Sequence, residues 1–239
     1  MEKGVLMSRQ KDVPLSQNTI DKTRLGSAFD ILSREIEAQR LPGAAAVVGR
    51  EDVIVGSFAS GNIMLDPSVK DSVNKHTIFD CASLTKVVVT LPLVMMLIEK
   101  GLIELSEPVS TYIPAFQTEA KSLVTIRHLL THTSGLKPHI SEDVTSWKPD
   151  EVKQFIYSQE LDRRPGECVV YSDLGFILLG DIIEIILNKP LDEAANEYIF
   201  NPIGMADTYF NPPEQLKSRI AATEFREDAG RFQWGEVHD

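Results

Sequence analysis

A serine and a lysine, Ser83 and Lys86, stand three residues apart at the start of a long apolar helical pattern. Side chains at this spacing lie one helical turn apart on the same face, so the hydroxyl and the amine can meet. A serine hydroxyl attacks a carbonyl only when a neighbouring base takes its proton, and a lysine serves as that base only if burial or a nearby cation lowers its pKa. The pair therefore predicts a nucleophile and its partner in proton transfer.

The same Ser-x-x-Lys spacing occurs at three other places in the chain, so spacing alone does not identify the site. The other pairs are Ser8/Lys11, Ser72/Lys75 and Ser134/Lys137. Ser83 is favoured because it opens a long apolar helix, where a serine and a lysine are costly to bury. The alternative is that Ser83 is a helix N-cap and that Lys86 extends its ammonium into solvent.

A second polar group, Tyr171-Ser172-Asp173, precedes another apolar helical pattern. A phenol beside a lysine cation could pass protons between the serine and a leaving group. The alternative is a core tyrosine followed by a serine or aspartate that caps the helix. A similar Tyr-x-Asn sequence begins at Tyr209, but it stands before two prolines in an irregular stretch and is the weaker candidate.

Composition narrows the classes of function. The 239 residues include 35 acidic and 24 basic side chains, and the net charge of -11 excludes an electrostatic grip on nucleic acid. No apolar run is long enough for a transmembrane helix. The N-terminus lacks the apolar stretch of a secretion signal, which predicts a cytoplasmic protein unless the true start of the chain lies upstream. Cys81 and Cys168 are too few for a disulfide scaffold and are expected to be reduced.

His128 and His132 have metal-ligand spacing, but they lack a third ligand in register.

Hydrophobic periodicity predicts a mixed opening region followed by a helix-rich one. A helix is expected over 19–39, and a hairpin of two strands over 44–49 and 53–59. A long helix is expected over 84–100, with a kink at Pro92. Shorter helices are expected over 125–131, 149–157, 173–187 and 192–198. The last stretch, 211–239, is polar and weakly periodic and is predicted to be loop.

Several segments, in this order, resemble the serine β-lactamase-related hydrolases, a family that includes class C β-lactamases, low-molecular-mass penicillin-binding proteins and esterases. The resemblance covers most of the chain. Its segments are Pro42-Gly43-Ala44, Thr77-Ile78-Phe79-Asp80, Ser83-Leu84-Thr85-Lys86, the stretch 125–136, Pro165-Gly166, the stretch 171–180 and Asn201-Pro202-Ile203-Gly204-Met205.

The resemblance implies an α/β (α+β) protein of the β-lactamase/transpeptidase-like fold, with an antiparallel sheet, flanking helices and a helical subdomain. One domain over 1–239 is expected. It would comprise an N-terminal helix and strands over 1–76, a helix-rich subdomain over 77–210 and an irregular tail over 211–239.

The resemblance also implies a serine hydrolase that forms an acyl-enzyme on a β-lactam, a D-Ala-type peptide or a small ester, with no metal and no cofactor. Ser83 would be the acylated nucleophile, and its backbone N–H would be one oxyanion donor. Lys86 would be its partner and Tyr171 a catalytic acid/base, while Asp173 would contribute to substrate binding. Whether Tyr171 or Lys86 is the general base stays open.

One departure from the family pattern is Asp173, where the family usually has asparagine. An ionised carboxylate can only accept hydrogen bonds, so Asp173 should hold Lys86 protonated and repel a substrate carboxylate. This departure favours Tyr171 as the working base. It also favours esters, or peptides that present an amine, over penicillins.

A larger departure is that no Lys-x-Gly or His-x-Gly occurs in the 239 residues. The family's third motif has one of these forms and supplies a second oxyanion donor, and loss of one such donor costs about 10²–10³ in rate. The expectation is a fold that is incomplete at the C-terminus, or one that a second chain completes. The alternative function is a catalytically impaired fragment, or a protein that keeps the fold to bind a muropeptide-like ligand or a partner.

Overall fold

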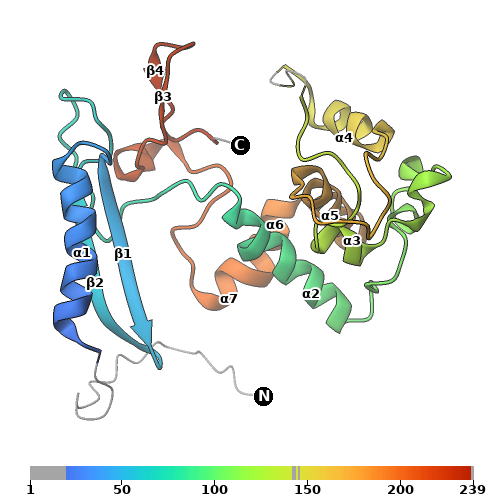
Figure 1. Cartoon of the computed structure of the whole chain (residues 1–239), viewed down its shortest axis with the longest axis horizontal. Coiled ribbons are helices and arrows are strands. Elements are labelled where there is room, and N and C mark those ends of the chain that lie inside the picture. Colours follow the sequence, from blue (N-terminus) through green and yellow to red (C-terminus); the bar gives the residue numbers. More distant parts are fainter. Residues whose placement is uncertain (1–19, 142–143, 145, 238–239) are drawn as a thin grey trace. The chain divides into compact units, whose positions relative to one another are not determined.

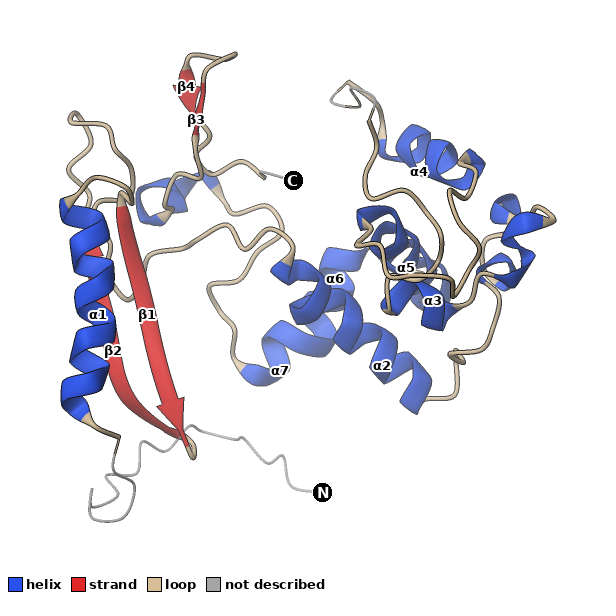
Figure 2. Ribbon diagram, viewed as in Figure 1, coloured by secondary structure: helices blue, strands red, loops and turns tan. Residues whose placement is uncertain are grey.

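The computed structural model describes residues 20–141, 144 and 146–237, and these form two compact units (Figure 1). The first unit combines the described residues up to Asp80 with those from Asn211 onward, and the second comprises the described residues between Cys81 and Phe210. The first unit holds the strands, and the second is built of helices and loops (Figure 2). No helix in the described part of the chain is long and apolar enough to cross a membrane.

The first unit begins with helix α1 (Lys22–Glu37), followed by an antiparallel pair of strands, β1 (Gly43–Arg50) and β2 (Val53–Gly61). Both the predicted helix and the predicted hairpin are confirmed. Glu51 and Asp52 join the strands with positive φ angles of 49° and 63°, as a tight two-residue turn requires. Helix α1 packs on β2, where the ring of Phe29 stacks on Phe58 with centroids 5.6 Å apart.

The stretch 211–239 was predicted to be loop. Three segments of its described residues form regular secondary structure, so the prediction was wrong for these segments. They include a 3₁₀ helix, η6 (Glu214–Arg219), and a short ribbon of β3 (Phe225–Arg226) and β4 (Arg231–Phe232). Between them, the N–H of Ala221 donates to the carbonyl of Ile78 (2.9 Å), and Ala221 is buried with Ile63 and Met64. These pairings join residues far apart in sequence, which periodicity within one segment cannot reveal.

The second unit surrounds one apolar core, to which nearly all its helices contribute. The predicted helices are all present. They are a π-helical turn η1 (Lys86–Thr90), α2 (Leu91–Glu99), α3 (Ile126–Leu130), α4 (Pro149–Ser158), α5 (Asp173–Leu187), α6 (Leu191–Ala195) and a second π-helical turn η5 (Asn196–Phe200). A short helix that was not predicted, α7 (Asn201–Ile203), follows η5. Three short 3₁₀ helices, which were not predicted, lie between α2 and α3: η2 (Val109–Thr111), η3 (Pro114–Phe116) and η4 (Ala120–Leu123).

The long helix predicted over 84–100 is confirmed, but its first part is wider than an α-helix. The π-helical turn carries Lys86, and the helix becomes regular at Leu91, with Pro92 in the first turn of α2. Pro92 has no N–H to donate to a carbonyl of the preceding turn, and it lies where the wide turn gives way to the regular helix. Wide turns of this kind are frequent at functional sites.

Candidate active site

A strained turn precedes Ser83. Ala82 has a φ of +42°, in the left-handed region, and its carbonyl accepts a hydrogen bond from the Thr85 hydroxyl at 2.7 Å. A non-glycine residue in this conformation costs about 1 kcal/mol or more and persists only where the surroundings enforce it. The turn brings the chain directly into the helix that carries Lys86.

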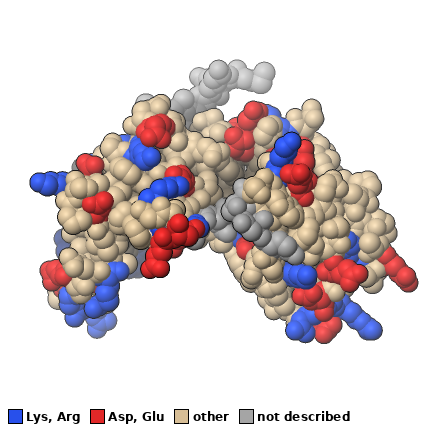
Figure 3. All heavy atoms as spheres, turned by 90° about the horizontal axis from the view of Figure 1, so that it is seen from above, with Lys and Arg blue, Asp and Glu red and all other residues tan. Residues whose placement is uncertain are grey.

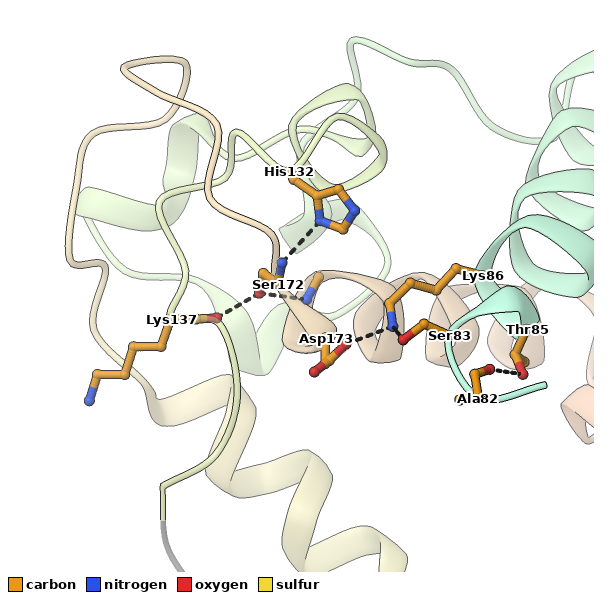
Figure 4. Close-up of polar contacts among 9 residues, drawn as sticks. Ala82, Ser83, Thr85, Lys86, His132, Lys137, Ser172 and Asp173 are labelled. Atoms are coloured by element: carbon orange, nitrogen blue, oxygen red, sulfur yellow. Dashed lines mark hydrogen bonds and ion pairs between the residues drawn. The ribbon is translucent and has the colours of Figure 1, made fainter. Parts of the chain in front are cut away.

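The side chains of Ser83, Lys86 and Asp173 meet at one point (Figure 4). Lys86 Nζ lies 3.0 Å from Ser83 Oγ and 2.6 Å from Asp173 Oδ1, so the ammonium bridges the hydroxyl and the carboxylate. The Lys86 side chain is only 12% exposed, so the alternative in which it extends into solvent is wrong. Asp173 is the first residue of α5, where the partial positive charge of the helix N-terminus favours a carboxylate.

The charge state of Lys86 follows from these contacts. Burial by itself lowers the pKa of this amine, but hydrogen bonds and charge attraction from Asp173 and Tyr171 outweigh burial and raise its pKa above the ordinary value. Lys86 is therefore a cation at neutral pH, as the sequence leads one to expect from an aspartate at position 173.

Tyr171 lies beside this ammonium. Lys86 Nζ is 5.0 Å from the centroid of the Tyr171 ring, within the range of a cation–π contact. Tyr171 is also 51% exposed, so it is not the core tyrosine of the alternative interpretation. The four residues predicted for the site thus belong to the second unit, and Lys86 contacts each of the other three.

Ser172 fixes the backbone of this segment from a buried position. It is the N-cap of α5, where its hydroxyl accepts from the N–H of Gly175 (3.3 Å) and donates to the carbonyl of Lys137 (2.6 Å). The capping interpretation is therefore correct for Ser172. Its own N–H donates to Nδ1 of His132 at 3.1 Å (Figure 4).

Sequence reasoning weighed His132 only as a metal ligand and missed its place beside Tyr171. The rings of these two residues lie 4.6 Å apart. His128 does not share a site with His132, because its Nδ1 accepts a hydrogen bond from the N–H of Thr125 at 3.2 Å. Within the described ranges, no group of three or more potential metal ligands occurs.

Cys81 is exposed and Cys168 is half-buried, and neither forms a disulfide in the part of the chain that the structure describes.

The amino-acid sequence matches that of a known protein family. Residues 29–238 fit the sequence model of a family described as Beta-lactamase. The chain belongs to this family. The β-lactamase/transpeptidase-like fold and the resemblance inferred from the motifs are thereby confirmed.

Two curated relatives and one solved structure illustrate the match. An N-acetylmuramyl-L-alanine amidase of Bacillus subtilis (strain 168) is 29% identical, over 90% of this chain and 56% of that protein. Esterase EstB of Burkholderia gladioli is 33% identical, over 78% of this chain and 51% of that protein. A class C β-lactamase shares the fold with a TM-score of 0.75 at 22% identity, covering 91% of this chain and 62% of that one. The chain spans about half the length of the curated relatives it matches.

Proposed function

We propose that Ser83 is the nucleophile of a serine hydrolase that works through an acyl-enzyme. The observation that carries this proposal is the position of the Lys86 ammonium, which touches both Ser83 Oγ (3.0 Å) and Asp173 Oδ1 (2.6 Å) in a half-buried site. A cation at this distance stabilises the negative charge that develops on the serine oxygen as it loses its proton. The family to which the chain belongs supports the same class of reaction.

Tyr171 is the group to which we assign proton transfer. Lys86 already carries its full complement of protons, because its contacts raise its pKa, and an ammonium cannot accept another. In the proposed step Ser83 Oγ forms a bond to the acyl carbon while its proton passes to the phenolic oxygen of Tyr171. Tyr171 gives its own proton to the leaving group as the bond to that group breaks, and water releases the acyl group by the reverse sequence.

The backbone N–H of Ser83 is the oxyanion donor that we assign within this chain. It lies in the turn directly before the helix, where N–H groups are available to a ligand and the helix dipole favours negative charge. The carbonyl oxygen of the substrate becomes negative in the tetrahedral intermediate, so a donor at this point lowers the barrier.

Neutral esters and amides are the substrates that the charge of the site supports best. The Asp173 carboxylate is 31% exposed beside Lys86, so a substrate carboxylate placed there would meet a like charge. The names of two relatives, an amidase and an esterase, agree with acyl donors of this kind. β-Lactams and D-Ala-type peptides carry a carboxylate and rank below neutral esters for this chain.

We also propose that the two units belong to a single domain, because the family match over 29–238 runs through both. Acidic and basic side chains are interspersed on the face drawn in Figure 3, so neither sign dominates there. A surface of that kind agrees with a small neutral substrate rather than a polyanion.

Labelling with a fluorophosphonate probe tests the proposed nucleophile. We expect stoichiometric labelling of the chain, complete loss in Ser83→Ala, and retention in Ser72→Ala, which removes the serine of another Ser-x-x-Lys pair. Labelling that survives in Ser83→Ala would contradict the assignment. A chain that is not labelled at all would favour the second candidate, a binding protein that keeps the fold.

A further inference from the structure

His132 adopts a left-handed backbone conformation, which few residues other than glycine take. It follows Thr131, the C-cap of α3, and has a φ of +55°, in the left-handed region. This conformation is uncommon outside glycine, although asparagine, aspartate and histidine take it more often than other residues, and it costs about 1 kcal/mol or more. The surroundings that hold it are the residues on either side of Tyr171.

His132 accepts hydrogen bonds from the residues on both sides of Tyr171. Its carbonyl accepts a hydrogen bond from the N–H of Val170 at 2.8 Å, and its Nδ1 accepts one from the N–H of Ser172 at 3.1 Å. Its ring also lies 4.6 Å from that of Tyr171 and 5.1 Å from that of Phe176. One residue therefore fixes the backbone around Tyr171 and supports the face of its ring.

The hydrogen bond from the N–H of Ser172 determines which ring nitrogen of His132 carries the proton. A ring nitrogen that accepts an N–H cannot itself carry a proton, so Nδ1 is bare and the proton of the neutral ring is on Nε2. Tyr171 lies against the ring, and the charges of Lys86 on η1 and Asp173 on α5 act on it. Burial and the Lys86 ammonium lower the pKa of His132, against the opposing effect of Asp173, so the ring is neutral at pH 7.

We propose that His132 is a positioning residue, whose neutral imidazole holds Tyr171 and Asp173 in register with Lys86 through the hydrogen bond from the N–H of Ser172. This inference rests on the proposed acyl-enzyme function of the same site. Ser172 stands between Tyr171 and Asp173, the two residues that hold the Lys86 ammonium. Loss of its hydrogen bond to His132 therefore lets both side chains move relative to Ser83. A displacement of about 1 Å in such a site can lower a rate about 10²-fold.

Two variants of His132 distinguish the effect of its hydrogen-bond acceptor from the effect of its aromatic ring. Asparagine tolerates the left-handed conformation and offers an amide oxygen near the position of Nδ1, so His132→Asn keeps the hydrogen bond. His132→Phe keeps an aromatic ring and lacks the acceptor. We expect His132→Phe to slow fluorophosphonate labelling of Ser83 by about 10-fold to 100-fold, and His132→Asn to stay within about threefold of wild type. Equal labelling rates in wild type and a folded His132→Phe would overturn the proposal.

The pH profile provides a readout that a purely structural role would not move. Below the pKa of His132 the ring gains a proton on Nδ1 and loses the Ser172 hydrogen bond, so the labelling rate of the wild type falls on the acid side. Asparagine does not titrate, so His132→Asn should lack this acid limb. An unchanged acid limb in His132→Asn would contradict the proposal.

Nitrogen NMR of the full chain, labelled with ¹⁵N-histidine, tests the inference independently of activity. The spectrum of His132→Asn identifies the resonances of His132 among those of the five histidines. We expect a neutral ring protonated on Nε2 at pH 7. A ring protonated on Nδ1, or an imidazolium, would overturn the inference even if Ser83 were acylated. Absence of labelling at Ser83 with the expected NMR signature would contradict only the proposed function.

Discussion

Lys86 Nζ and Asp173 Oδ1 lie 2.6 Å apart, although 87 residues separate them in the sequence. The contact joins the helix that follows Ser83 to the N-terminus of α5, and it determines the charge state of the amine. A lysine that must take a proton from serine works best with a lowered pKa, whereas Asp173 raises it. This pairing is the reason for assigning proton transfer to Tyr171.

Asp173→Asn should make the site more tolerant of substrate carboxylates. The amide removes a like charge and can donate a hydrogen bond, so we expect the acylation rate with a fluorescent penicillin to rise about tenfold relative to that with a neutral ester. Acylation by both reagents is measured on wild type, on the variant and on Asp162→Asn, an exposed acid in the same unit. An unchanged or lower penicillin rate in Asp173→Asn would count against a role for this charge in selectivity.

Tyr171→Phe removes the proposed acid/base while keeping the ring against His132. We expect the acylation rate to fall by about 10²–10⁴, the usual range for loss of a general acid–base group. Tyr209→Phe is the matched control, because Tyr209 is the other candidate tyrosine of the sequence and its hydroxyl donates to the carbonyl of Ala206. A Tyr171→Phe variant that acylates at the wild-type rate would return the role of base to Lys86.

The Lys86–Asp173 pair predicts a particular dependence of stability on pH. The folded-state pKa of Lys86 is raised above the ordinary lysine value of 10.5, so its stabilising contribution is complete below that pH and is lost as pH rises through the folded value. The difference in unfolding free energy between wild type and Asp173→Asn should therefore be constant from about pH 6 to pH 9 and change only in more alkaline solution. Denaturant titrations at each pH measure it, and a change centred near neutrality would refute the pair as its source.

Lys121 is a buried cation with a structural function. It is 3% exposed, and its Nζ donates to the carbonyls of Tyr157 (2.5 Å) and Gln159 (3.2 Å) at the C-terminal end of α4. Lys121→Met leaves these carbonyls without their donor and should lower the unfolding free energy by about 2–4 kcal/mol. Lys75→Met, at an exposed position, should change it by less than about 0.5 kcal/mol. Equal stabilities of the two variants would show that the buried contacts contribute little.

Sequence periodicity found the elements that carry the site because each is long. The helix of Lys86 and the helix that begins at Asp173 both have apolar stripes that repeat over several turns. The π-helical turn at Lys86 was not predicted, since it changes the hydrogen-bond pattern without changing the apolar residues. Strands β3 and β4, of two residues each, are too short to show any alternation.

The residues that sequence reasoning missed are those whose partners are distant in the chain. Lys121 stands in a polar stretch, and only tertiary packing shows that the carbonyls at the end of α4 enclose its ammonium. His132 has its partner 40 residues away, at Ser172. The local signal for His132 was the sequence Thr131-His132-Thr133-Ser134-Gly135, in which a turn directly follows a short helix and a histidine can adopt a left-handed conformation.

Intact mass of the chain before and after incubation with a neutral ester and with a fluorescent penicillin tests the central claim most directly. We expect one acyl group per chain with the ester, located by peptide mapping on Ser83 and absent from Ser83→Ala. An adduct that persists in Ser83→Ala, or a wild-type chain that gains no acyl group from either reagent, would contradict it.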